Sequence, residues 1–271
     1  MGVGFCAEQV AGDALWEQRS SVCAPRAERA FGPKNTLAAF DHAVGLGCSF
    51  LELDVRATSD GVPVVIHDAE VDRVSDGRGP VSGYSAAELA DLDAGFRWSE
   101  DGRSFPFRGQ GIRIPTLREV LDRYPRAWIS VDIKATDPGR RSGWRSSSRR
   151  SSAERTVVGS FSRYTARRFR RFEPHAHASA CPAEVRRTVA AAVSGLKPLV
   201  PRRPDFLMVP EYWGRTRVVT EAFVRAAGHR ETRVFVWTVN DEQTAARLSS
   251  LGVDGLITDF PAQISRPRAA P

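Results

Sequence analysis

The chain has 271 residues, of which 42% are hydrophobic, enough for the core of one large α/β barrel or of two small domains. No apolar run approaches the ~18 residues of a membrane span, and the N-terminus lacks the basic and apolar regions of a signal peptide. The four cysteines are scattered without metal-site spacing, so reduced thiols and a cytoplasmic location are expected.

The net charge of +7 comes from one segment. Residues 140–171 hold eleven arginines and one glutamate, a local charge of +10, which leaves −3 for the rest of the chain. A nucleic-acid surface needs interleaved aromatics or a known reading module. Trp144 and Tyr164 are present without such a module, so a nucleic-acid partner is the least favoured hypothesis.

Short β-branched runs alternate with amphipathic stretches along the chain. Strands are expected at 21–24, 50–55, 128–133, 156–160, 176–180, 206–209, 234–239 and 255–258. Helices are expected at 35–46, 86–92, 117–124, 165–172, 182–193, 221–228 and 241–251. This alternation predicts an α/β fold, a TIM (β/α)8 barrel, with a small insertion after strand two at about 71–127. An open doubly wound sheet is less favoured because no glycine-rich dinucleotide turn follows strand one.

The barrel is expected to occupy residues 21–265. Residues 1–20 are assigned to an N-terminal extension and residues 266–271 to a C-terminal tail. Residues 135–153 are rich in Arg and Ser and have no apolar face. We therefore expect this segment to be irregular, and residues 140–152 within it to be poorly ordered or loosely packed.

The stretch 50–68, FLELDVRATSDGVPVVIHD, combines an apolar strand with ionisable groups. Glu52 and Asp54 share one strand face because side chains alternate with a period of two. Asp60-Gly61 is a strong hairpin signal. Folding about this turn places His67 opposite Asp54 as a cross-strand pair. A solvent-facing edge hairpin is the alternative, and the apolar opposite face argues against it.

Barrel enzymes carry their chemistry at the carboxyl ends of the strands. Asp132 and Lys134 end strand three, and Trp237 ends strand seven. Asp132 with Glu52 and Asp54 forms a hard oxygen site suited to one divalent cation, Mg²⁺ or Ca²⁺. Lys134 is a candidate phosphate clamp, and His67 is the candidate acid or base. An ordinary strand-end ion pair between Asp132 and Lys134 is the simpler alternative.

Five sequence blocks together resemble the glycerophosphodiester phosphodiesterase family: PKNTLAAF, ELDVRATSDGVPVVIHD, VDIK, FVWTVN and GVDGLITDFP. The resemblance covers most of residues 22–262. It implies a TIM barrel with a small insertion after strand two. It also implies metal-dependent hydrolysis of small glycerophosphodiesters to glycerol 3-phosphate and an alcohol, a reaction of lipid metabolism.

The resemblance also implies roles for individual residues. Glu52 and Asp54 match metal ligands, and Asp132 fills the position of a third ligand that is usually Glu. His67 matches one of two catalytic histidines. Arg26 matches a phosphate ligand, and Lys134 and Trp237 are expected to bind substrate.

The family's first His-Arg-Gly motif is degenerate in this chain. The aligned residues are Pro25, Arg26 and Ala27, so proline stands at the position of the first catalytic histidine. Proline can neither transfer a proton nor donate a backbone N–H. Losing one proton carrier is expected to slow hydrolysis by about 10²–10⁴-fold. The alternative is a non-catalytic barrel that binds phosphodiesters or metal.

Overall fold

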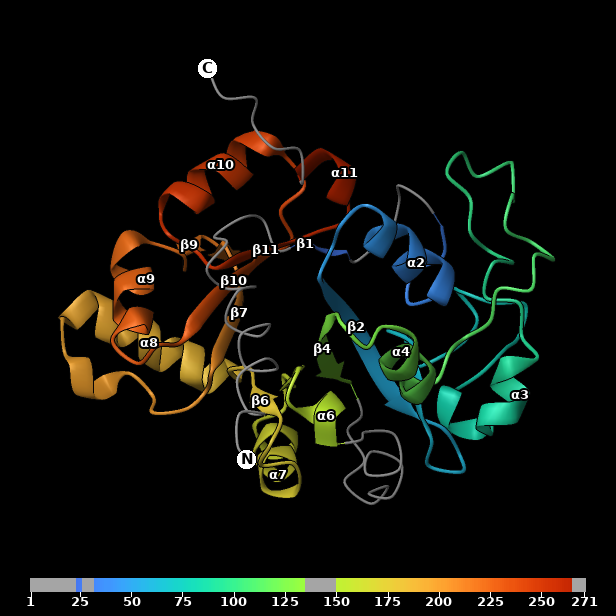
Figure 1. Ribbon diagram of the computed structural model, residues 1–271, viewed down its shortest axis with the longest axis horizontal. Helices are drawn as coiled ribbons and strands as arrows, with labels where there is room; N and C mark the ends of the chain where they lie inside the picture. Colours follow the sequence, from blue (N-terminus) through green and yellow to red (C-terminus); the bar gives the residue numbers. More distant parts are fainter. Residues whose placement is uncertain (1–22, 26–31, 135–149, 265–271) are drawn as a thin grey trace, which may run out of the picture.

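A computed structural model describes residues 23–25, 32–134 and 150–264 of the chain. Within these ranges, eight parallel strands alternate with helices (Figure 1). The strands are β1 (Cys23–Pro25), β2 (Phe50–Ala57), β4 (Trp128–Ile133), β5 (Thr156–Gly159), β6 (His177–Ala178), β7 (Phe206–Pro210), β10 (Arg233–Trp237) and β11 (Gly255–Thr258). The expected α/β barrel architecture is therefore present.

The strands form two hydrogen-bonded sheets that together make a ring. One sheet has the order β1-β11-β10-β7, and the other continues from β2 through β4 and β5 to β6. A parallel bridge between Ser179 and Phe206 joins β6 to β7. On the other side β1 lies next to β2, but the described residues form no ladder between them. The carboxyl half of β2 pairs instead with the antiparallel strand β3 (Pro63–Val65).

Helices cover the outside of the ring (Figure 1). They are α2 (Leu37–Gly45), α4 (Leu117–Arg123), α6 (Arg150–Ala153), α7 (Arg163–Phe172), α8 (Pro182–Ser194), α9 (Glu221–Gly228), α10 (Glu242–Ser250) and α11 (Pro261–Ile264). Side-chain oxygens of Thr36, Thr116, Ser162, Thr220 and Asp241 accept the first free N–H groups of their helices. Each of these helices therefore begins at a capping residue that the sequence supplies.

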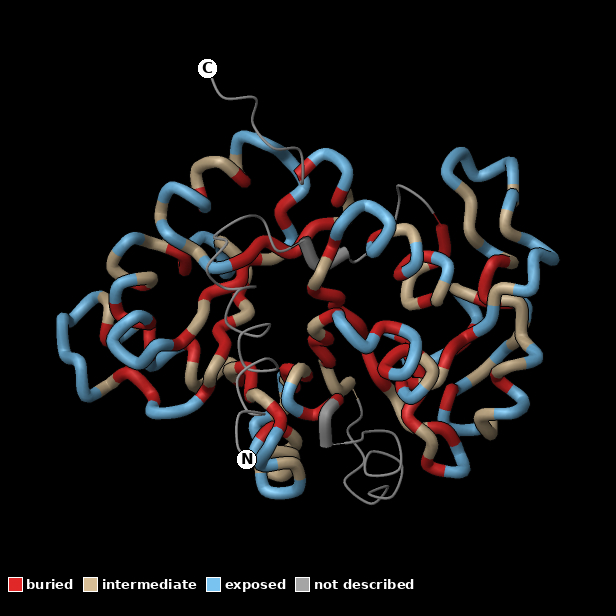
Figure 2. Tube along the Cα trace, viewed as in Figure 1, coloured by how far each residue is buried: buried red, intermediate tan, exposed pale blue. Residues whose placement is uncertain are grey.

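Aromatic rings fill the inside of the ring. Phe50, Phe206 and Phe235 come from three different strands and are fully buried in one cluster. The ring centroids of Phe50 and Phe235 lie 4.8 Å apart. Gly255 leaves the space that the Phe235 ring occupies, because a Cβ at Gly255 would lie 2.4 Å from that ring. Residues buried between strands and helices form a second, larger core (Figure 2).

The connection after β2 has a small core of its own. It contains β3, the 3-10 turn η1 (Val81–Gly83) and helix α3 (Ala86–Ala90). The buried members of this core are Val64, Ile66, Val71, Val81, Leu89, Ala94 and Ile114. The excursion lies to the right of the ring in Figure 1, and it leaves the carboxyl end of β2 in place beside β4.

The hairpin register differs by one residue from the prediction. Val55 pairs with Val65, and the Ile66 N–H donates to the Asp54 carbonyl, so Asp54 lies opposite Ile66. The predicted cross-strand pair of Asp54 with His67 is wrong. The cause is loop length: Thr58 N–H donates to Val62 O across a three-residue loop, with Gly61 at φ +81°. Such loops place glycine in the left-handed region, whereas a two-residue turn was assumed.

Most predicted elements are present with ends shifted by at most two residues. The helix expected from residue 35 begins at Leu37, because Thr36 is its N-cap. The hairpin β8 (Tyr212–Trp213) and β9 (Thr216–Arg217) and the 3-10 turn η2 (Lys197–Leu199) were not predicted.

The basic segment and the termini are described only in part. Residues 135–149, the extension 1–20 and the tail 266–271 lie outside the described residues. The one part of the Arg/Ser-rich segment that is described, α6, is a single turn with Ser152 and Ala153 buried. Residues 140–151 have no described side chains, so the expectation of poor order or loose packing at 140–152 stays a prediction. Over the described ranges, every helix is too short or too polar to cross a lipid bilayer.

Candidate active site

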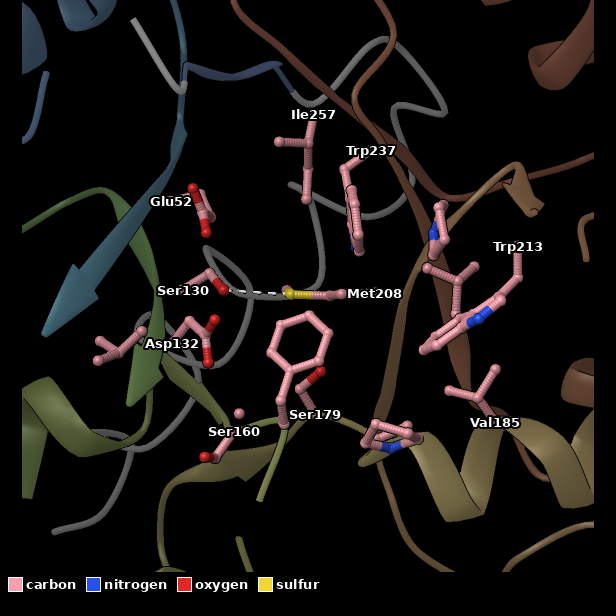
Figure 3. A pocket seen from close by; sticks show the side chains of 17 residues that line it. Glu52, Ser130, Asp132, Ser160, Ser179, Val185, Met208, Trp213, Trp237 and Ile257 are labelled. Carbon is pink, nitrogen blue, oxygen red and sulfur yellow. Dashed lines mark hydrogen bonds between the residues drawn. The ribbon is translucent and has the colours of Figure 1, made fainter. Parts of the chain in front are cut away.

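Two neighbouring strands bring carboxylates together at their carboxyl ends. In the β2–β4 ladder, Asp54 is paired with Asp132, and Glu52 is paired with Ser130. Glu52 and Asp54 share a strand face as predicted, and both are buried, at 6% and 4% exposure. Glu52, Ser130 and Asp132 line the same pocket (Figure 3). The sequence thus supplies a buried group of negative charges that requires a cation.

Lys134 provides a cation within the protein. Its Nζ lies 2.8 Å from Asp132 Oδ2 and 3.1 Å from Asp54 Oδ1. Burial pulls the pKa of Lys134 down, but the Coulombic attraction of Asp54 and Asp132 outweighs it, so the pKa is raised overall. The lysine therefore stays protonated and bridges the two carboxylates.

Asn35 fixes the other side of Asp54. Its Nδ2 donates to Asp54 Oδ2 at 3.2 Å, and its Oδ1 accepts from the Asp54 backbone N–H at 3.3 Å. Asn35 has a φ of +57°, a conformation that asparagine adopts more readily than most residues. Sequence reasoning did not select Asn35, although it belongs to the PKNT block.

The donor set suits a hard divalent cation, but the three carboxylates do not enclose one. In the part of the chain that the structure describes, no three His, Cys, Asp or Glu side chains are grouped so that they could hold a metal ion. The expected convergence of Glu52, Asp54 and Asp132 on one point is therefore not seen. The reason is local: the Lys134 ammonium lies between Asp54 and Asp132. Among the described residues, Asp54 Oδ1 is buried without a hydrogen bond and its charged partner is the Lys134 ammonium, as expected of a cation ligand.

The pocket beside these carboxylates has two chemically different walls (Figure 3). Glu52, Ser130 and Asp132 make the polar wall, and Ser130 Oγ donates to Met208 Sδ at 3.1 Å. The facing wall is apolar and includes Val185, Met208, Trp213, Trp237 and Ile257. Phe161 packs edge-on against Trp237, with ring centroids 6.5 Å apart. The polar wall is acidic and suits a cation, whereas the apolar wall suits carbon-rich groups of a ligand.

His67 lies on the exposed side of the β2–β3 unit. Its side chain is 50% exposed, and Nδ1 lies 2.8 Å from Asp68 Oδ1. A hydrogen bond to Arg73 is the main cause that lowers the pKa of Asp68 to about 2, so Asp68 is anionic at neutral pH. An anionic Asp68 holds the proton of the neutral ring on Nδ1, which leaves Nε2 as the base. Arg56 Nε donates to the His67 carbonyl at 2.9 Å and so supports the backbone here.

Pro25 ends β1 in register with Thr258 of β11. The carboxyl end of β1 therefore reaches the same edge as Asp259, which follows β11. Asn240, which follows β10, connects the end of that strand to the end of β11. Its Nδ2 donates to Asp259 Oδ2 at 3.1 Å, and its Oδ1 accepts from the Asp259 backbone N–H at 2.9 Å. Arg26, predicted to bind phosphate, lies outside the described residues.

Comparison with known proteins identifies the family. Residues 26–263 match the Glycerophosphoryl diester phosphodiesterase family. The chain belongs to this family. The glycerophosphodiester phosphodiesterase of Caldanaerobacter subterraneus is 30% identical over 251 residues, which cover 90% of this chain and 95% of that protein. The Bacillus subtilis protein YhdW is 32% identical over 264 residues, with 89% and 94% covered.

Solved structures agree with the family fold. A phosphodiesterase from Oleispira antarctica, solved with the product sn-glycerol-3-phosphate, superimposes with a TM-score of 0.68 at 24% identity, over 91% of this chain and 96% of that one. Structural similarity at this identity establishes the shared TIM barrel. The roles of individual residues depend on the geometry of the site itself.

Besides Asn35, sequence reasoning missed Asp68, Phe161 and Trp213. Asp68 directly follows His67, so its role could have been inferred from the ability of neighbouring carboxylates to orient imidazoles. Phe161 and Trp213 carry no such signal, because they come from a loop after β5 and from the unpredicted β8–β9 hairpin.

Proposed function

We propose that this protein hydrolyses glycerophosphodiesters to glycerol 3-phosphate and an alcohol. The observation that carries the proposal is the Asp54–Lys134–Asp132 arrangement at the carboxyl ends of β2 and β4, in a chain that belongs to the phosphodiesterase family. A phosphodiester is an anion, and its transition state concentrates charge on the phosphoryl oxygens. A divalent cation held by these carboxylates, together with the Lys134 ammonium, would stabilise that state more than the substrate.

One divalent cation, Mg²⁺ or Ca²⁺, is part of the proposal. Glu52, Asp54 and Asp132 would hold it, since carboxylate oxygens are the ligands these ions prefer. When bound, the cation would supply Lewis-acid polarisation of a phosphoryl oxygen. Asp132 is one methylene shorter than the usual Glu, which favours a more open and weaker site.

The chain's own residues divide the remaining tasks. The pKa of Lys134 is raised, so the side chain is protonated and can turn from the carboxylates to a phosphoryl oxygen. Trp237 and Phe161 offer ring surfaces to the carbon arms of the substrate. His67, oriented by Asp68, gives or takes a proton at one end of the displacement. Arg26 is proposed to bind the phosphate.

The test is direct turnover. Purified protein is incubated with sn-glycerol-3-phosphocholine and 1 to 10 equivalents of Mg²⁺ or Ca²⁺, and glycerol 3-phosphate is measured enzymatically. We expect slow, metal-dependent release that Asp54→Asn abolishes. Asp41→Asn is the matched control, because Asp41 pairs with Arg123 on the outer surface. Release that survives Asp54→Asn would overturn the proposal.

A non-catalytic phosphodiester-binding barrel is the second candidate. Pro25 favours it, because the carboxyl end of β1 then lacks the imidazole expected there. The same incubation distinguishes the two functions. Saturable binding of the phosphodiester without any release of glycerol 3-phosphate would establish a binding protein.

A further inference from the structure

Helix α7 presents two adjacent rows of side chains that take no part in the catalytic pocket. Residues four apart lie on the same helix face. One row is Arg163, Arg167 and Arg171, and the next is Tyr164, Arg168 and Phe172. These six side chains line one hollow of the surface. We call this set the α7 face; helix α7 lies at the lower edge of the molecule in the view of Figure 1.

The positive charge of the α7 face is not neutralised within the described structure. The helix has no acidic residue. Arg170, which points inward, forms a two-pronged pair with Glu184 at 2.6 and 2.8 Å. The four arginines of the α7 face have no carboxylate partner among the described residues. Uncompensated charge at this density favours an anionic partner.

The aromatic members of the α7 face are exposed at both ends of their row. Tyr164 is 60% exposed and Phe172 is 38% exposed. The Arg168 guanidinium lies between them, 5.8 Å from each ring centroid, and its Nη1 donates to Tyr164 Oη at 2.9 Å. The Arg168 guanidinium therefore competes with a base for both rings. Nucleic-acid bases need open ring faces for stacking, so the arrangement disfavours a nucleic-acid partner.

We propose that the α7 face docks this protein on an anionic phospholipid bilayer. Arginine forks bind lipid phosphates, and amphipathic rings insert at the headgroup boundary. Each basic residue adds to the attraction of an anionic leaflet. The contact is peripheral, which agrees with helices that are too short or too polar to span a bilayer in the described ranges. Phe161, at the pocket rim, precedes α7 by two residues, so docking brings the pocket close to the lipid surface.

The proposal stands independently of catalysis and is tested by vesicle sedimentation. Full-length protein is mixed with vesicles of phosphatidylcholine alone or with 30 mol% phosphatidylglycerol. We expect binding only to the anionic vesicles. Replacing the arginine row (Arg163→Gln, Arg167→Gln, Arg171→Gln) is expected to weaken binding on the order of 100-fold, from the contribution of each basic residue at an anionic surface. Tyr164→Ala with Phe172→Ala is expected to weaken it less.

A matched control distinguishes the effect of the α7 face on vesicle binding from the effect of the net charge. Arg186→Gln, Arg187→Gln and Arg230→Gln remove the same charge from exposed positions on α8 and after α9. These changes are expected to alter binding less than threefold. Equal losses in the two triple variants would overturn the proposal, as would equal binding to neutral vesicles. Tighter, row-dependent binding to an RNA or DNA duplex would assign the α7 face to nucleic acid instead.

Discussion

Asp54 and Asp132 are register partners on neighbouring parallel strands, and the Lys134 ammonium bridges their carboxylates. Two buried like charges side by side are unfavourable without a cation between them. The tethered ammonium supplies that charge, and the divalent ion proposed for this site would have to displace it to reach both carboxylates. The proposal therefore predicts that the stability of the barrel mouth depends on which cation is present.

Lys134→Met tests this linkage. Removing one partner of a buried ion pair leaves uncompensated charge, so we expect a loss of about 3 kcal/mol in the free energy of unfolding. Millimolar Mg²⁺ or Ca²⁺ is expected to restore part of it. Urea unfolding with chelator and with each metal measures both effects. Arg123→Met, which breaks the half-exposed pair with Asp41, is the control and has no expected metal dependence. A Lys134→Met loss unaffected by metal would contradict a shared cation site.

Restoring the missing imidazole is expected to raise turnover. Pro25→His with Ala27→Gly supplies a second proton carrier at the end of β1, and the expected gain is about 10²-fold or more. Initial rates of glycerol 3-phosphate release measure it. Pro25→Ala with Ala27→Gly removes the proline without adding a proton carrier and is the matched control. An equal gain in both variants would show that backbone relief, not proton transfer, was limiting.

His67→Ala is expected to remove most of the residual hydrolysis, by about 10²-fold or more, since one proton carrier would be lost. Asp68→Asn is expected to have a smaller effect in the same direction, because the ring loses its orienting carboxylate. Both substitutions are expected to lower kcat and to leave KM unchanged. His42→Ala, on the outer helix α2, is the control. Unchanged kcat in His67→Ala would remove His67 from the mechanism.

His177 makes stability depend on mildly acidic pH. Burial against Trp128 and Phe206 is the main cause that lowers its pKa below 6.5. The unfolded chain therefore binds this proton more readily than the folded one. Stability is full above about pH 6.5 and falls as pH drops toward the folded-state pKa.

Replacing His177 checks that pH dependence. The ring faces Asp205, which opposes the shift, and Arg233, which adds to it. Between pH 7.5 and 5.5, His177→Phe is expected to lose less unfolding free energy than the unaltered chain. His229→Gln, at an exposed helix end, is expected to follow the unaltered chain. Parallel pH profiles for all three proteins would exclude His177 as the source.

Gly255→Ala tests the aromatic interior. The added methyl would lie 2.4 Å from the Phe235 ring, and overpacking of this kind costs about 1–3 kcal/mol. Combining it with Phe235→Leu is expected to relieve part of the loss. Gly228→Ala has nothing within 4 Å of the new methyl and is expected to be neutral or stabilising. Thermal unfolding compares the three variants. A neutral Gly255→Ala would mean that the interior is looser than the contact implies.

The sequence predicted the barrel because apolar runs mark eight strands and amphipathic helices lie between most of them. It failed at the hairpin register, where Gly61 opens a three-residue loop. A single residue in a loop moves every following side chain to the other face. The ion pair of Lys134 with Asp132 was named as an alternative, but its second contact, with Asp54, was not predicted. Strand period shows which face a side chain takes but not where a four-carbon chain ends. Asn35 was missed because its effect depends on a left-handed backbone conformation.

Strand β1 has a ladder with β11 but none with β2 among the described residues, so it behaves there as an edge strand. Edge strands tolerate proline, because one row of their backbone groups has no ladder to break. A histidine-to-proline change at position 25 can therefore remove a proton carrier at small cost to folding. Folding assays alone would report a sound protein, whatever its turnover. Loss of activity through a change at this position in related chains can therefore be detected only by measuring turnover, since measurements of stability will not reveal it.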